Sequence, residues 1–183
     1  ALMMRNPSLN RALIGLTVSG DDEKGKMERE RGKVLLEQAV KICEAADVPM
    51  QTHSRLATNI ASGVLHTFNE TESSEMVVGM HHKRSIADSF FGELTQHLLT
   101  GTFRQLIIVK CLIPVNTLRS IHVMVPQSAE YEVGFRRWID RLSRMALQLG
   151  CRITFYGPKF TNELIGHYIQ GTHGHVRMAM ETM

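Results

Sequence analysis

The stretch Glu75–Gly101, EMVVGMHHKRSIADSFFGELTQHLLTG, decides the fold. It begins with an apolar run typical of a buried β-strand, and its second half has the periodicity of an amphipathic helix. Between them lies a basic loop with His81, His82, Lys83 and Arg84. In α/β proteins, a strand that leads through a loop into a helix often binds phosphate, although such loops are usually rich in glycine. The stretch therefore indicates an α/β fold and a candidate anion site.

Strand-like and helix-like segments alternate along the rest of the chain. The run RQLIIVKCLI (residues 104–113) is the most apolar expected strand, and RALIGLTV (residues 11–18) is another. Parallel strands need crossover connections that usually contain a helix, so this order predicts a parallel sheet with helices on both faces. Further strands are expected at 50–57, 75–80, 120–126, 151–157 and 175–183, and helices at 33–49, 58–74, 86–102, 132–150 and 161–170.

Two of the expected helices have an apolar face at helical spacing. In the helix over 33–49 this stripe is formed by Val34, Leu35, Ala39, Ile42 and Ala46. In the helix over 132–150 the apolar positions are Phe135, Trp138, Ile139, Leu142, Met145, Ala146 and Leu149, and Gly150 ends the helix. Both faces are expected to pack against the sheet.

The composition of the 183 residues is that of a soluble globular protein, with 43% hydrophobic and 21% charged residues. A net charge of +3 with interleaved acids and bases does not indicate a nucleic-acid partner. The cysteines at 43, 111 and 151 are far apart, which predicts neither a disulfide framework nor a metal site. No run approaches the roughly 20 apolar residues of a membrane span.

No pattern of catalytic residues is present, and we expect the chain not to be an enzyme. It has no nucleophile elbow and no Walker loop. The adjacent His81 and His82 seldom share one ion without ligands from elsewhere, so no metal is expected.

The segment of residues 73–110 resembles the last third of a universal stress protein domain. That family carries a strand, the motif G-x2-G-x9-G-(S/T), a helix and a closing apolar strand. Here Gly79 and Gly92 take the places of the first and third glycines. His82 stands at the second glycine and Glu93 at the Ser/Thr position. The resemblance implies a stress-protein-like, Rossmann-like α/β fold with a degenerate nucleotide loop.

A second series of elements, residues 121–157, resembles the opening of another such domain. Nucleotide-binding members place an Asp after the first strand, where this chain has Pro126, whereas Ser128 keeps its place. Tandem domains with degenerate loops, together with LATNIASG (residues 56–63) and RQLIIVK (residues 104–110), are most similar to the cytosolic C-terminal tail of bacterial monovalent cation/proton antiporters.

On this resemblance, residues 1–113 are an incomplete stress-protein-like domain that lacks its first strand, and residues 114–183 are the first part of a second domain. The missing strand would expose two strand edges, which is costly. The strand at Ile121 could insert between those at 13–18 and 76–79 and form a permuted sheet. Alternatively, the two half-domains pair with another chain.

The function implied is that of a noncatalytic cytosolic regulatory or assembly domain of a sodium or potassium/proton antiporter. The alternative is a stand-alone nucleotide-binding universal stress protein. Expected partners are the membrane transport domain of the same polypeptide and a second copy of the chain, and the expected place is the cytoplasmic side of the inner membrane. The degenerate loop residues are expected to bind no cofactor, with weak binding of adenine nucleotides or anions as the minority view: Gly79, His81, His82, Lys83, Arg84, Gly92 and Glu93.

Overall fold

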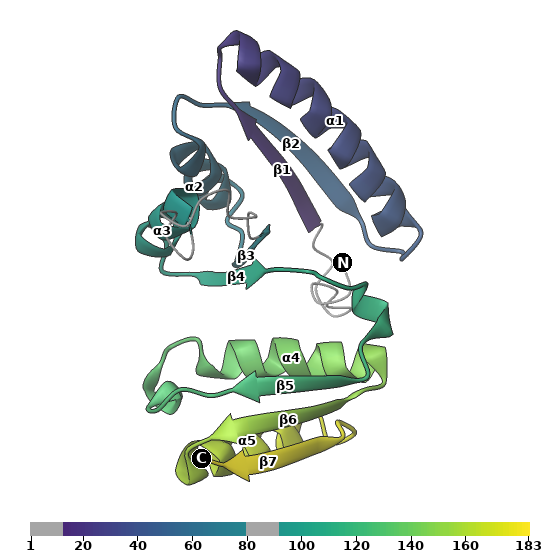
Figure 1. Cartoon of the computed structure of the whole chain (residues 1–183), viewed down its shortest axis with the longest axis vertical. Coiled ribbons are helices and arrows are strands. Elements are labelled where there is room, and N and C mark those ends of the chain that lie inside the picture. Colours follow the sequence, from purple (N-terminus) through teal and green to yellow (C-terminus); the bar gives the residue numbers. More distant parts are fainter. Residues whose placement is uncertain (1–12, 80–91) are drawn as a thin grey trace. The chain divides into compact units, whose positions relative to one another are not determined.

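The computed structural model describes residues 13–79 and 92–183, which fall into two compact units divided between Lys110 and Cys111 (Figure 1). The first unit contains β1 (Leu13–Ser19), α1 (Glu23–Glu44), β2 (Met50–Leu56), α2 (Ile60–Glu70), β3 (Glu75–Gly79), α3 (Gly92–Gly101) and β4 (Gln105–Val109). The second contains the 3₁₀ turns η1 (Val115–Thr117) and η2 (Ala129–Tyr131) and the elements β5 (Ser120–Met124), α4 (Phe135–Leu149), β6 (Arg152–Gly157), α5 (Lys159–Thr172) and β7 (Met178–Thr182).

All strand pairs in the described residues are parallel. In the first unit β1 pairs with β2, and β3 pairs with β4, as two separate ladders. In the second unit the order is β5-β6-β7. Each paired strand is connected to the next through a helix, as the alternation in the sequence predicts. The predicted α/β class with parallel strands is confirmed.

Helices lie on both faces of β1. A side chain built at Gly32 of α1 would come 3.0 Å from Thr17 Cγ2, and one built at Gly63 of α2 would come 2.7 Å from Val18 Cγ1. Thr17 and Val18 are neighbours in the strand, and successive side chains point to opposite faces. Helix α1 therefore covers one face of β1 and α2 covers the other.

The prediction for the apolar face of α1 is wrong at three positions. Val34, Leu35 and Ile42 are 53%, 62% and 66% exposed. The helix instead approaches β1 at Gly32, beside Thr17, and at Leu36, whose Cδ2 would lie 2.9 Å from a Cβ built at Gly15. The buried residues of α1 are Gly25, Gly32 and Cys43.

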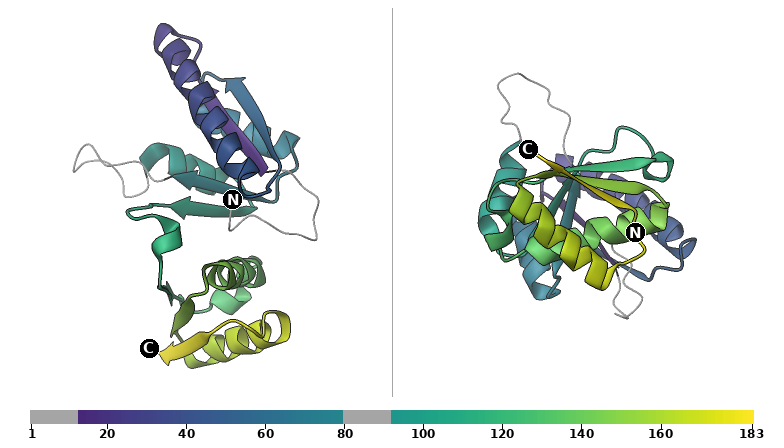
Figure 2. Two further views of the ribbon diagram at one scale, coloured as in Figure 1. Left: turned by 90° about the vertical axis from the view of Figure 1, so that its right-hand side faces the viewer. Right: turned by 90° about the horizontal axis from the view of Figure 1, so that it is seen from below.

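The core of the second unit lies on one face of its sheet. Ile153 and Phe155 of the central strand β6 are fully buried and point to the same face. They share a cluster with Ile139 of α4 and with Ile165 and Ile169 of α5, so both helices cover this face (Figure 2).

The predicted apolar face of α4 is confirmed. Phe135, Ile139 and Ala146 are buried, and the Phe135 and Trp138 rings meet edge to face with centroids 5.6 Å apart. Gly150 ends the helix with φ +63°, a left-handed conformation that glycine adopts without strain. The remaining predicted residues, Trp138, Leu142, Met145 and Leu149, are partly buried against the same core.

In the described residues, β5 forms its ladder with β6, with Ser120 opposite Arg152. The permuted sheet and the division into parts of two stress-protein domains stay predictions.

Candidate functional site

The two ends of the predicted phosphate loop are described. Gly79 is the last residue of β3 and Gly92 is the first residue of α3. His81, His82, Lys83 and Arg84 lie outside the described residues. The proposed role of this loop therefore stays a prediction.

The two described ends of the loop differ in how well they would accommodate a phosphate. A Cβ at Gly79 would meet no atom of residues 13–79 or 92–183 within 4 Å, so the described part of the chain does not crowd this glycine. Glu93 is exposed in the first turn of α3, where the helix dipole favours a carboxylate. A phosphate bound there would be repelled by this carboxylate. The Glu93 carboxylate therefore argues against a tight phosphate site at the start of α3.

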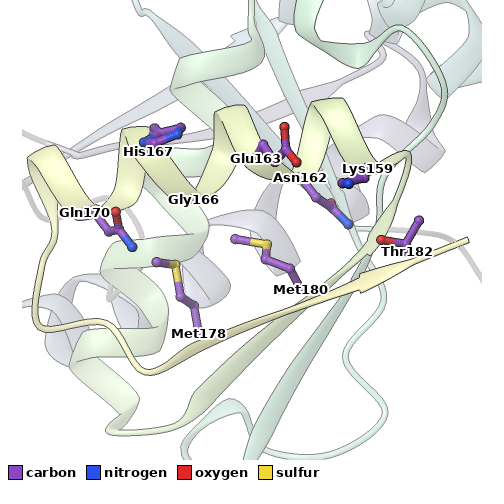
Figure 3. A pocket seen from close by; sticks show the side chains of 9 residues that line it. All are labelled: Lys159, Asn162, Glu163, Gly166, His167, Gln170, Met178, Met180 and Thr182. Atoms are coloured by element: carbon purple, nitrogen blue, oxygen red, sulfur yellow. The ribbon is translucent and has the colours of Figure 1, made fainter.

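A groove of about 380 Å³ lies in the second unit, between α5 and the edge strand β7 (Figure 3). The lining residues recur every three to four positions along the helix and every second position along the strand, as expected for one face of each. The lining residues are Lys159, Asn162, Glu163, Gly166, His167 and Gln170 from α5, with Met178, Met180 and Thr182 from β7.

The groove has an apolar floor and a polar rim. Met178 and Met180 are partly buried and project toward α5, while Glu163, His167 and Gln170 are exposed along the helix (Figure 3). A Cβ at Gly166 would lie 3.6 Å from Met180 Cε, so the absence of a side chain at this glycine leaves space in the groove beside the methionine. Such a surface suits the apolar side chains of another segment, because methionine adapts to irregular partners.

Asn162 fixes one end of the groove. Its side chain is 3% exposed, and its Nδ2 donates hydrogen bonds to the carbonyl oxygens of Gly157, 3.2 Å away, and Glu181, 3.0 Å away. One amide thus joins α5 to the ends of β6 and β7. This contact adds to the β6–β7 ladder in holding the edge strand beside the helix.

The described part of the chain offers no group of three or more His, Cys, Asp or Glu side chains that could hold a metal ion. Its described helices also include none with the length and hydropathy of a membrane span.

The groove was not among the sites predicted from the sequence. The helix at 161–170 and the strand at 175–183 were both expected, but nothing in either segment shows that they face each other. A usable signal was the alternation of Met178, Met180 and Thr182 along one face of a strand.

Parallel ladders joined by helices, on both sides of the break at Lys110, define a universal stress protein-like, Rossmann-like fold. One similar structure is a crystal structure from Pseudomonas aeruginosa UCBPP-PA14 whose description assigns it provisionally to the universal stress proteins. It matches with a TM-score of 0.57 and 10% identity, over 97% of this chain and 76% of that one.

A second similar structure is PA1789 from Pseudomonas aeruginosa PAO1, described as functionally unknown. It matches with a TM-score of 0.52 and 9% identity, over 94% of this chain and 63% of that one. At these identities the similarity concerns the fold alone. No protein-family profile and no curated protein matches the sequence.

Proposed function

We propose that this chain is a noncatalytic regulatory and assembly domain on the cytosolic side of a bacterial sodium or potassium/proton antiporter. The observation that carries the proposal is the division of the strands. Among the described residues, β1 is hydrogen-bonded to β2 alone and β3 to β4 alone. In open α/β sheets, ligands bind at the carboxyl ends of strands at a topological switch point. With two separate ladders, such a site needs a strand from elsewhere, which suits a module that works by assembly.

The start of α3 supports the noncatalytic part of the proposal. Glu93 occupies the first helical turn, the position at which a phosphate would be stabilised by the helix dipole. The carboxylate fills that electrostatic role itself. Regulation would then come from protein contacts, with the membrane domain of the same polypeptide and with a second copy of the chain as partners.

A transport assay tests the proposal. Everted membrane vesicles would be prepared from cells that express the full polypeptide containing this chain, and from cells that express it without residues 13–183. We expect sodium or potassium/proton exchange in both, with an altered dependence on pH or on cation concentration after the deletion. A polypeptide without membrane spans, or an unchanged exchange profile, would contradict the assignment.

A stand-alone nucleotide-binding stress protein is the second candidate. It is favoured by Gly79 and Gly92, which keep the first and third glycine positions of the family motif. Titration of the chain with ATP, ADP and AMP by calorimetry separates the two functions. Micromolar affinity for any of them supports the second candidate, and absence of heat supports the first.

A further inference from the structure

Strand β7 forms one edge of the β5-β6-β7 sheet, and its outward-facing backbone groups can be identified. The Ile153 amide donates to the carbonyl oxygen of Arg177 at 3.0 Å, and the Met183 amide donates to that of Gly157 at 3.2 Å. Backbone groups alternate in direction along a strand, so the odd-numbered residues of β7 bond toward β6. The residues whose N–H and C=O groups point away from β6 are Met178, Met180 and Thr182.

We propose that this edge pairs with β7 of a second copy of the chain, antiparallel, about a two-fold axis at Ala179. In this register Met178 of each copy lies opposite Met180 of the other. Both are outward-facing residues, so each such pair can exchange two backbone hydrogen bonds. A two-fold interface uses the same patch on both chains, and this strand is complementary to itself.

Charge selects this register over its neighbours. With the axis at Ala179, Arg177 of each copy lies directly opposite Glu181 of the other, on the face away from α5. An axis at Met180 places Glu181 opposite Ala179 and loses the ion pairs. An axis at Glu181 places two carboxylates opposite each other, which is destabilising. Of these three registers, only the one with its axis at Ala179 therefore forms two equivalent Arg–Glu pairs.

The groove beside β7 fits the same arrangement. Residues directly opposite across antiparallel strands point to the same face, so Met178 and Met180 of the second copy project to the groove side. Helix α5 packs on both β6 and β7. With strands about 4.8 Å apart, two such helices would lie about 10 Å from each other, a normal packing distance. Because Gly166 has no side chain, it leaves room for the two helices to approach each other.

Sedimentation velocity on the full chain tests the pairing, with a monomer mass of 20.7 kDa. We expect a reversible dimer whose dissociation constant rises about tenfold or more in Glu181→Arg, because two attractive pairs become repulsive. The double variant Arg177→Glu with Glu181→Arg should restore dimerisation. Glu132→Arg, an exposed charge reversal outside β7, is the matched control and should change nothing.

Glu181→Arg is the decisive single variant, because Arg177 also donates a hydrogen bond from Nη2 to the carbonyl oxygen of Gly150. A chain that is monomeric at all concentrations overturns the proposal. A dimer unaffected by Glu181→Arg, or a double variant that does not recover while its circular dichroism is native, overturns the proposed register.

Disulfide trapping gives an independent measurement. In a Cys111→Ser background, which removes the exposed cysteine, Ala179→Cys would face itself across the axis at about 4.5 Å between Cα atoms, a separation that a disulfide can bridge. Thr182→Cys would face Val176 and should cross-link far more slowly. Equal rates for the two variants would contradict the Ala179 axis. Because no step depends on transport, a β7 dimer without antiport leaves this inference intact.

Discussion

Asn162 Nδ2 donates a hydrogen bond to the main-chain carbonyl oxygen of Glu181, 3.0 Å away, and so ties the first turn of α5 to the end of the edge strand β7. The same nitrogen reaches the carbonyl oxygen of Gly157 at 3.2 Å. Asn162 is buried, so little water competes with these bonds in the folded protein.

Asn162→Ala should therefore lower the free energy of unfolding by about 2 kcal/mol, from the loss of two hydrogen bonds that join α5 to the ends of β6 and β7. Urea unfolding followed by fluorescence measures the change, because the single tryptophan, Trp138, packs against the core of this unit. The control is Gln170→Ala, an exposed position on the same helix. Equal effects of the two changes would show that the amide contacts are not stabilising.

Arg104 should hold α2 against the start of β4 in the first unit. Its Nη1 donates to the carbonyl oxygens of Ser73 at 2.7 Å and Phe68 at 3.3 Å, and its guanidinium lies 5.1 Å from the Phe68 ring centroid. Arg104→Met keeps the aliphatic stem but removes these contacts, with an expected loss of about 1–2 kcal/mol. Hydrogen exchange of the α2 amides should quicken, whereas Arg31→Met, at an exposed position of α1, should leave it unchanged.

Glu30 provides a test of pH dependence. Its Oε1 accepts a hydrogen bond from Lys33 Nζ at 2.8 Å, and this bond, with the charge of the same ammonium, holds the pKa of Glu30 below its ordinary value of 4.5. A lowered pKa in the folded state contributes stability above the ordinary value, and that contribution is lost as pH falls through the lowered pKa. The pair is exposed, so the effect on overall stability is small.

Lys33→Gln should raise the pKa of Glu30 toward 4.5, measured by NMR titration of its side-chain carboxyl carbon. Lys24→Gln is the matched control, because Lys24 pairs with Glu28 in the same helix. An identical titration of Glu30 in wild type and Lys33→Gln would show that the ion pair does not form in solution.

Restoring the family signature tests whether the loop is degenerate. His82→Gly together with Glu93→Ser completes the pattern G-x2-G-x9-G-S between Gly79 and residue 93. Removal of the carboxylate and of the side chain at 82 should favour phosphate binding. We expect ATP binding by calorimetry to be stronger in the double variant than in wild type. Unchanged weak binding would indicate that the loop conformation, rather than these two residues, excludes the nucleotide.

Helix α4 and its flanks show what a sequence reveals when local periodicity and packing agree. The apolar residues from Phe135 to Leu149 recur at helical spacing, and Gly150 supplies the left-handed terminus. Both were predicted and both are confirmed, because the apolar stripe of α4 is the face that packs against the core of its sheet.

Helix α1 shows the opposite case. Its apolar residues Val34, Leu35 and Ile42 indicate one buried stripe, but close approach to β1 takes place at Gly32, beside Thr17. Periodicity shows which helix residues are hydrophobic. The face that contacts the sheet, however, is the one whose side chains are small enough for the helix to approach the strand closely. The contact face therefore depends on the side chains of the strand as much as on those of the helix.

By itself, the sequence determined the alternation of strands and helices, the parallel α/β class and the likeness of the Gly79–Glu93 region to a phosphate loop, because these depend on residues near each other in the chain. Tertiary structure alone decided that the strands divide into separate ladders and that Asn162, Met178 and Met180 meet at one groove. Such features depend on hydrogen bonds and packing between segments distant in sequence, which no local pattern encodes.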